Sequence, residues 1–86
     1  MEILFSRRFI KRYAKLTREN KERVDTVIDI FQRNPFDARL VNHKLTGSRK
    51  DMRAVWAGYD LRLLYVEQNG YLIVLFVDVG THDEVY

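Results

Sequence analysis

The C-terminal third of the chain restricts the fold most, because it reads as two strands joined by a tight turn. Residues 61–67 have the alternating side chains of a strand, and residues 71–77 (YLIVLFV) are apolar on both faces. The dipeptide Asn69-Gly70 between them favours a type I′ turn, which needs positive φ at both central positions. The sequence therefore predicts an antiparallel β-hairpin closed by a two-residue turn.

The second strand of this hairpin is apolar on both faces, which is typical of a strand in the centre of a sheet. Only two helices are predicted, however, and together they can cover one side of a sheet. The other side would then expose Leu72, Val74 or Phe76, and an exposed apolar patch often marks a partner site. The alternative is that the C-terminal segment folds back and covers this side.

Two helices are predicted in the first half of the chain from their caps and their spacing. Ser6 and Thr17 suit the N-cap position. Apolar residues recur at i, i+3, i+4 and i+7 over residues 24–31, which gives the second helix one core-facing side. Asn34 precedes Pro35, and this order disfavours helical backbone, so the second helix is expected to end just before the pair. The two helices should form an antiparallel hairpin.

The remaining segments complete the predicted order of elements. Residues 3–5 read as a first strand, residues 36–50 as a polar, irregular loop, and residues 52–57 as a further strand. The order is therefore β-α-α-β-β-β. We expect an α+β fold in which a helical hairpin packs on a small, mainly antiparallel four-stranded sheet. At 86 residues the whole chain, 1–86, is expected to be one domain.

The residue types and motifs that are missing exclude several kinds of protein. The chain has no Cys, which excludes disulfides, a thiol nucleophile and thiolate metal ligands. It has no HExxH or comparable spacing and no glycine-rich phosphate loop, so neither a metal nor another cofactor is expected. The N-terminus lacks a secretory-signal pattern, and no apolar run reaches the ~18 residues of a membrane span. We therefore expect a cytoplasmic protein.

Basic residues gather in the first quarter of the chain. Residues 1–23 hold eight Lys or Arg and three Glu, a balance of +5, whereas residues 54–86 hold one Arg and five acids, a balance of −4. This asymmetry predicts a surface that faces a polyanion, although a basic helix face is often simply solvated. On a helical projection four basic residues form one stripe beside the apolar side, namely Arg8, Lys11, Arg12 and Lys15.

The chain has only two His residues, and each lies beside other polar groups at the end of a loop or strand. His43 is in the segment NHKL, and His82 is in the C-terminal segment GTHDEVY. Imidazole exchanges a proton near neutral pH, so it can serve as a general acid or base. Two imidazoles, a carboxylate, a Tyr and several cations are the groups needed to cut RNA, whose 2′-OH is an internal nucleophile.

The chain resembles the RelE/ParE superfamily of toxins from bacterial and archaeal toxin–antitoxin pairs, and within it the RelE/StbE and YafQ-like mRNA interferases. The segments that carry the resemblance are FSRRFIKRYAKL, NPFDARLVNHKLTGSRKDMRAVWAGYDLRLLYV and VLFVDVGTHDEVY, which span essentially the whole chain. The resemblance implies a sheet packed on a helical hairpin, and cleavage of translated mRNA in the ribosomal A site without a metal. It also implies a cognate antitoxin protein that wraps the toxin.

The resemblance also implies an active site. His43 matches the His of the family's HKL element, and Asp60 matches the Asp of the strand after the central turn. His82 and Tyr86 match the His and the closing aromatic of the terminal motif. Trp56 is a departure, because YafQ-like members carry another His four residues before the Asp. This Trp either stacks on an mRNA base or packs on the sheet.

The expected roles of these residues follow from proton transfer. His82 is the favoured general acid or base. The complementary group is His43 or Asp60, unless Asp60 instead orients an imidazole. Tyr86 is expected to stack on the substrate or to hydrogen-bond it near the scissile phosphate.

Cations are needed to balance the charge that grows on the phosphate. Arg62 is either such a cation or the partner of Asp60 or Glu67 in a salt bridge. The basic stripe on the first helix is expected to contact ribosomal RNA, with the salt dependence of phosphate contacts. The candidate phosphate clamps are Arg53, Arg62 and Lys44.

Two other functions remain open at this point. A ParE-like toxin shares the fold, binds DNA gyrase and cleaves nothing. A non-catalytic nucleic-acid-binding module would also fit the basic surface. The combination of His43, His82 and Tyr86 favours the nuclease, because a pure binder does not need that set of groups.

Overall fold

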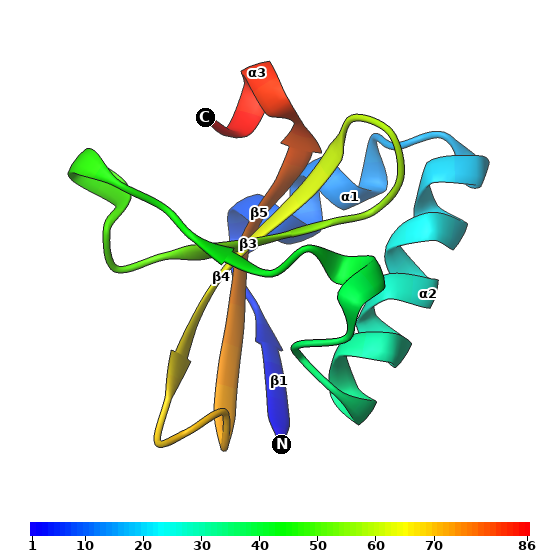
Figure 1. The fold of residues 1–86 in the computed structure, drawn as a ribbon. Helices are drawn as coiled ribbons and strands as arrows, with labels where there is room; N and C mark the ends of the chain where they lie inside the picture. The colour runs from blue at the N-terminus through cyan, green and yellow to red at the C-terminus, as the bar shows by residue number, and fades with distance from the viewer.

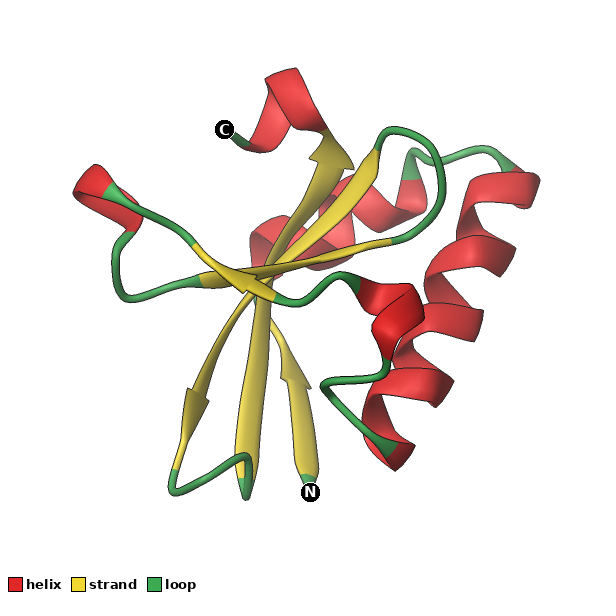
Figure 2. Ribbon diagram, in the orientation of Figure 1, coloured by secondary structure: helices red, strands yellow, loops and turns green.

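Two helices cover one side of a five-stranded sheet in the computed structural model, which describes all 86 residues (Figure 1, Figure 2). The strand order is β1-β5-β4-β3-β2, with β1 parallel to β5 and the other neighbours antiparallel. The elements are β1 (Glu2–Phe5), α1 (Arg7–Ala14), α2 (Arg18–Arg33), β2 (His43–Lys44), β3 (Arg53–Trp56), β4 (Leu61–Gln68), β5 (Ile73–Thr81) and α3 (His82–Val85), with 3₁₀ turns η1 (Ala38–Leu40) and η2 (Gly47–Arg49).

The predicted α+β fold, with a helical hairpin on a mainly antiparallel sheet, is confirmed, but the number of strands differs. The sheet has five strands because His43 and Lys44 pair with Ala54 and Arg53. These two residues lie inside the stretch that the sequence predicted as an irregular loop. Two paired residues are too few to produce a period-two pattern, so only the contact with β3 defines this strand.

The helix boundaries follow the local signals in the sequence. The Ser6 hydroxyl accepts from the Phe9 amide, and the Thr17 hydroxyl accepts from the Asn20 amide. The helix α2 ends at Arg33, and Asn34 is extended with φ of −159°. Each cap satisfies an amide that would otherwise lack an intrahelical partner. The predicted caps and the predicted end of the second helix are therefore confirmed.

The core lies between the helices and the sheet and is rich in aromatic rings. Phe31 of α2 is fully buried, with ring centroids 4.9 Å from Tyr65 on β4 and 5.3 Å from Phe76 on β5. Both pairs meet edge to face, a favourable geometry for aromatic rings. Val24 and Val27 are buried on the same side of α2. The predicted core-facing side of this helix is thus the side that packs.

The turn between β4 and β5 is longer than predicted. Asn69, Gly70 and Tyr71 all have positive φ, and Gln68 pairs with Ile73, so four residues connect the strands. Tyr71 leaves the strand because its amide donates to the Glu67 carboxylate at 2.8 Å and its hydroxyl hydrogen-bonds that of Tyr65 at 2.8 Å. The antiparallel hairpin and the positive φ at Asn69 and Gly70 are confirmed, whereas the turn is longer than the two residues predicted. An aromatic residue favours a strand locally, whereas here tertiary packing draws it out of the strand.

The two faces of β5 are the reverse of those predicted. Val74 and Phe76 are buried against the helices, whereas Ile73, Leu75 and Val77 lie half-buried on the other side of the sheet. The two extra turn residues do not change the faces, because a shift of two residues keeps every side chain on its own side of the sheet. Packing selects the buried face, since Phe76 lies opposite Tyr65 and both rings meet Phe31 of α2.

The open side of the sheet is covered at one end only. Val85 of α3 is fully buried in a small cluster with Ala54 and Leu64. Farther along the sheet, Leu4 and Val66 are both paired with Leu75; Leu4 is exposed, and Val66 and Leu75 are half-buried. Both alternatives for this side are therefore partly right, because the C-terminal segment folds back over one end and leaves an apolar patch. We call Leu4, Val66 and Leu75 the open patch.

Candidate active site

The C-terminal Tyr86 lies between the two His residues. Its hydroxyl is 3.4 Å from Nε2 of His43, and its ring meets the His82 ring edge to face with centroids 4.5 Å apart. His43 comes from β2, and His82 begins α3, which lies at the end of the sheet opposite the β4–β5 turn (Figure 1). The structure therefore brings together three of the four residues that the sequence proposed as catalytic.

A backbone hydrogen bond fixes the chemistry of the His43 ring. Its Nδ1 lies 2.8 Å from the carbonyl oxygen of Val41. A carbonyl oxygen only accepts, so Nδ1 carries the hydrogen. In the neutral ring Nε2 is then an acceptor, and it faces the hydroxyl of Tyr86. This arrangement suits a group that takes up a proton.

His82 is the more accessible of the two imidazoles. Its side chain is 57% exposed, and its Nδ1 lies 3.5 Å from the carboxylate of Asp83. His82 is therefore open to a ligand.

Tyr86 remains a neutral hydroxyl at physiological pH. Burial raises the pKa of the Tyr86 phenol, and the positive charge of Arg62 opposes this effect only in part. The phenol therefore keeps its proton and can donate a hydrogen bond beside His43.

An open cavity adjoins the His43 and Tyr86 side chains. Its volume is about 470 Å³, and eight residues from β2, the turn around η2 and the C-terminus line it. Two of them, Lys44 and Arg49, place positive charge beside His43. Lys44 was predicted from the sequence and Arg49 was not, although the basic run at residues 49–50 directly after the turn was a usable signal. The cavity can therefore take an anionic ligand.

Asp60 does not contact either imidazole. Both its carboxylate and its carbonyl oxygen accept from the backbone amide of His82, at 3.4 and 3.2 Å. It holds the first residue of α3 in place by these bonds. In this structure Asp60 thus positions the His82 backbone, and the orientation of a ring by its carboxylate is not seen.

Arg62 is directed at the protein's own backbone. It is buried, and its guanidinium donates to the carbonyls of Gly58, Tyr59 and Leu61. The same group lies 4.3 Å from the centroid of the Trp56 ring, in a cation–π contact. The salt bridge with Asp60 or Glu67, which the sequence left open as the alternative for Arg62, is absent, and the guanidinium bonds to these carbonyl oxygens instead.

Trp56 and Arg53 lie on different sides of the sheet. Trp56 is 39% exposed beside Arg62, on the sheet face rather than in the core. Arg53 shares the side of Val55, which faces the helices; it donates to Asn42 and stacks over Phe36. The structure therefore leaves part of Trp56 free to stack on a base and does not bring Arg53 to the cavity.

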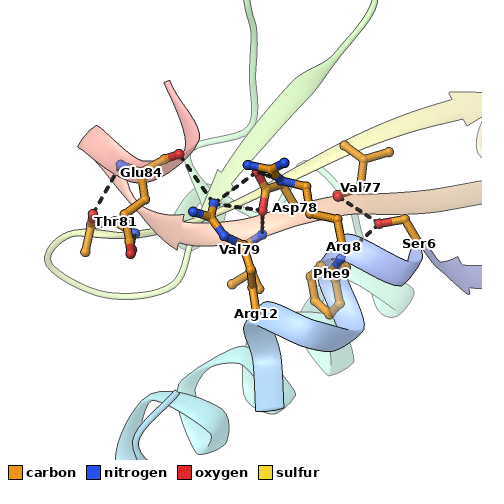
Figure 3. A network of polar contacts seen from close by, with 9 residues as sticks. All are labelled: Ser6, Arg8, Phe9, Arg12, Val77, Asp78, Val79, Thr81 and Glu84. Atoms are coloured by element: carbon orange, nitrogen blue, oxygen red, sulfur yellow. Dashed lines mark hydrogen bonds and ion pairs between the residues drawn. The ribbon is translucent and has the colours of Figure 1, made fainter. Parts of the chain in front are cut away.

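The basic stripe of α1 is only partly free. Arg8 and Arg12 both pair with the carboxylate of Asp78 on β5, whereas Lys11 and Lys15 are exposed and make no ion pair (Figure 3). Asp78 is the one acid in a mostly apolar strand, and no role was predicted for it. Two of the four cations in the stripe are therefore paired with Asp78, although the Arg8 side chain stays 65% exposed.

A capping box fixes the beginning of α3. The Thr81 amide donates to the Glu84 carboxylate at 2.8 Å, and the Thr81 hydroxyl accepts from the Glu84 amide at 3.3 Å. The first of these bonds and then the Thr81 side chain lower the pKa of Glu84 from its ordinary 4.5. Because the folded-state pKa of Glu84 is lowered, its ionised carboxylate stabilises the fold at pH values above the ordinary 4.5. This contribution is lost as the pH falls through the folded-state pKa.

We expect Gly80→Ala to loosen α3. A Cβ at this position would lie 2.9 Å from the Glu84 carboxylate oxygen and 3.3 Å from Val85, so the capping box must shift. Loss of a cap costs about 1 kcal/mol of stability. Urea denaturation and amide hydrogen exchange across residues 82–86 measure the effect. Thr81→Ala, which removes the same box without crowding, serves as the comparison and should act in the same direction. Unchanged stability and exchange in Gly80→Ala would contradict this reading.

Neither a metal-ligand cluster nor a membrane-spanning helix is present. No three His, Cys, Asp or Glu side chains lie close enough together to hold a metal ion. None of the helices combines the length and the apolar composition that crossing a bilayer requires.

The fold is that of RelE-like toxins. YafQ from E. coli strain BL21(DE3) is 21% identical, with a TM-score of 0.79 over 99% of this chain and 97% of that one. A YoeB/ParE toxin from Agrobacterium tumefaciens is 14% identical, with a TM-score of 0.80 over 95% and 99%. RelE in the RelE-RelB complex of Pyrococcus horikoshii OT3 is 17% identical, with a TM-score of 0.74 over 93% and 92%.

The family model of YafQ, described as a bacterial toxin of type II toxin–antitoxin systems, matches residues 1–86. The chain therefore belongs to the YafQ family of type II toxins. No curated protein sequence matches it.

Proposed function

We propose that this toxin is an endoribonuclease that cuts translated mRNA in the ribosomal A site, in the cytoplasm and without a metal cofactor. The observation that supports this most strongly is the row of His43, Tyr86 and His82 beside a cavity lined with Lys44 and Arg49. A toxin that only blocks a protein partner does not need two imidazoles around a neutral phenol. Membership of the YafQ toxin family supports the same conclusion.

In this mechanism the two imidazoles divide the proton transfers. Nε2 of His43 takes the proton of the ribose 2′-OH, whose oxygen attacks the adjacent phosphorus. The bond from phosphorus to the 5′-oxygen breaks, and His82 protonates that oxygen as it leaves. The products are a 2′,3′-cyclic phosphate and a free 5′-OH, so protons and electron pairs balance. Tyr86 donates a hydrogen bond near the scissile phosphate.

Positive charges around the cavity stabilise the phosphate during this step. Lys44 and Arg49 take the role of phosphate clamps, because they line the same cavity as His43. Trp56 offers the exposed part of its indole ring for stacking on a base. On α1, the unpaired Lys11 and Lys15 contact ribosomal RNA, with help from the exposed part of Arg8.

The partner of the toxin is a cognate antitoxin protein. A DinJ-YafQ complex from E. coli and the RelE-RelB complex of Pyrococcus horikoshii are both similar structures in which a toxin is bound to a second protein. The open patch of Leu4, Val66 and Leu75 provides a place for an apolar segment of the antitoxin. The antitoxin then acts by covering the cavity or by preventing docking on the ribosome.

The test is to induce the toxin without its antitoxin and map the 5′ ends of cellular mRNA. We expect new ends that follow the codon phase of translated frames and disappear when initiation is blocked. Intact mRNA with stalled replication would instead support a ParE-like gyrase inhibitor. An absence of any phenotype would support a non-catalytic nucleic-acid-binding module. Either of these outcomes rejects the nuclease.

A further inference from the structure

Asp78 is a buried carboxylate that serves as an anchor. Its side chain is 6% exposed, and it accepts from Nε of Arg8 at 3.1 Å and from Nη1 of Arg12 at 3.1 and 3.2 Å (Figure 3). The amide of Val79 donates to it as well, at 2.9 Å. A buried carboxylate with this many donors is held in one position. It therefore gives β5 a rigid point to which α1 is fastened.

Arg12 extends this anchor to the C-terminal helix. The same Nη1 that pairs with Asp78 lies 3.3 Å from the carbonyl oxygen of Glu84 in α3 (Figure 3). Carbonyl groups in the last turn of a helix lack intrahelical partners, and an Arg side chain can supply the missing donor. A four-residue helix cannot be stable by itself. Its position must therefore come from such outside contacts.

We infer that Arg12 is a positioning residue for the active site, which acts by holding α3 and with it His82 and Tyr86. This inference rests on the proposed nuclease function. Arg12 bonds to Glu84 in α3, two residues before Tyr86, while the capping box secures the beginning of the helix. Loss of this contact would let Tyr86 move away from His43, and a displacement of about 1 Å can reduce a rate ~100-fold.

Arg8 provides a matched control for Arg12 within the protein. Both residues lie on α1, both carry one positive charge, and both pair with the carboxylate of Asp78. Arg12 also touches α3, whereas Arg8 donates only to Asp78. Substituting either residue removes the same charge from the surface that faces RNA. Any difference between the two variants therefore reports on the contact with Glu84.

The experiment compares Arg12→Gln with Arg8→Gln in the full chain. Amide hydrogen exchange of Glu84 and Tyr86, and the NMR shifts of the His82 ring, report on the position of α3. Single-turnover cleavage of mRNA on programmed ribosomes reports on function, and ribosome affinity is measured separately. In Arg12→Gln we expect the α3 amides to exchange about tenfold or more faster and mRNA to be cleaved about tenfold or more slower. The loss of a hydrogen bond to a charged group has an effect of this size. Arg8→Gln should match the parent in α3 exchange, and its small loss of ribosome affinity should equal that of Arg12→Gln.

Two outcomes would overturn the inference that Arg12 holds α3. They are an unchanged α3 exchange rate in Arg12→Gln, or equal effects of the two substitutions on α3. Arg12→Lys protects the test against misfolding, because it keeps the ion pair with Asp78; its α3 exchange should fall between those of the parent and Arg12→Gln. If the parent protein does not cut mRNA, the proposed function fails, whereas the exchange data still decide whether Arg12 holds α3.

Discussion

We expect His82→Ala to abolish mRNA cleavage and growth arrest in a protein that stays folded. The side chain is more than half exposed; its ring meets that of Tyr86, and its Nδ1 lies 3.5 Å from the Asp83 carboxylate. The hydrogen bonds to Asp60 come from the backbone amide, which the substitution keeps. Loss of a general acid lowers the rate about 10²–10⁴-fold. Single-turnover cleavage on programmed ribosomes measures the loss, and thermal unfolding checks the fold.

A modified substrate tests the assignment of His82 as the acid. When sulfur replaces the 5′-oxygen at the scissile bond, the leaving thiolate needs no proton, so the general acid becomes dispensable. We therefore expect this substrate to restore most of the activity of His82→Ala. Tyr59→Ala, which removes a fully exposed ring from the turn before β4, is the control and should cut like the parent. Full growth arrest by His82→Ala would exclude the residue from catalysis.

Local signals in the sequence predicted the helices, because caps act within a few residues. Ser6 and Thr17 form hydrogen bonds three residues away, and Pro35 restricts the residue immediately before it. Such effects can be read without knowing the rest of the fold. The alternation of side chains in β4 is also a local pattern, because it appears in the sequence wherever one face of a strand is buried.

Features that depend on distant contacts could not be predicted in this way. Tyr71 leaves β5 because its ring packs against Phe31 of α2 and its hydroxyl bonds to that of Tyr65. The pairing of Arg12 with Asp78 joins residues 66 positions apart. A charge pattern alone does not show which basic side chains find such partners, so the stripe on α1 looked continuous.

For the candidate site as well, some residues could be predicted from the sequence and others depend on distant contacts. His43, His82 and Tyr86 were expected together because of the family resemblance, whereas their spacing alone gave no geometry. The assignment of clamps was harder, since Arg, unlike Lys, bonds well to backbone carbonyls and to aromatic faces. Arg62 does both, and Arg53 turns to the helix side of the sheet. Arg49 reaches the cavity only because the turn around η2 folds back beside β2.

We expect His43→Gln to lower cleavage to a similar extent, about 10²–10⁴-fold, by removing the general base. Glutamine keeps a polar side chain beside Tyr86 but cannot take up a proton at neutral pH. Because the Val41 carbonyl holds the hydrogen on Nδ1, the substitution removes the proton acceptor Nε2, which faces the hydroxyl of Tyr86. The rate is measured as for His82. Thr46→Val, on the lining of the same cavity, is the control and should retain activity.

The sulfur-substituted substrate separates the two imidazoles. A better leaving group removes the need for an acid but leaves the 2′-OH as difficult to deprotonate as before, so it should not restore His43→Gln. Rescue of both variants would mean that neither residue is the base, and rescue of His43→Gln alone would reverse the assignment. Since the two imidazoles act on one transition state, the double variant should lose less than the product of the single losses. A fully multiplicative loss would show that His43 and His82 act independently, which the single phenol between them argues against.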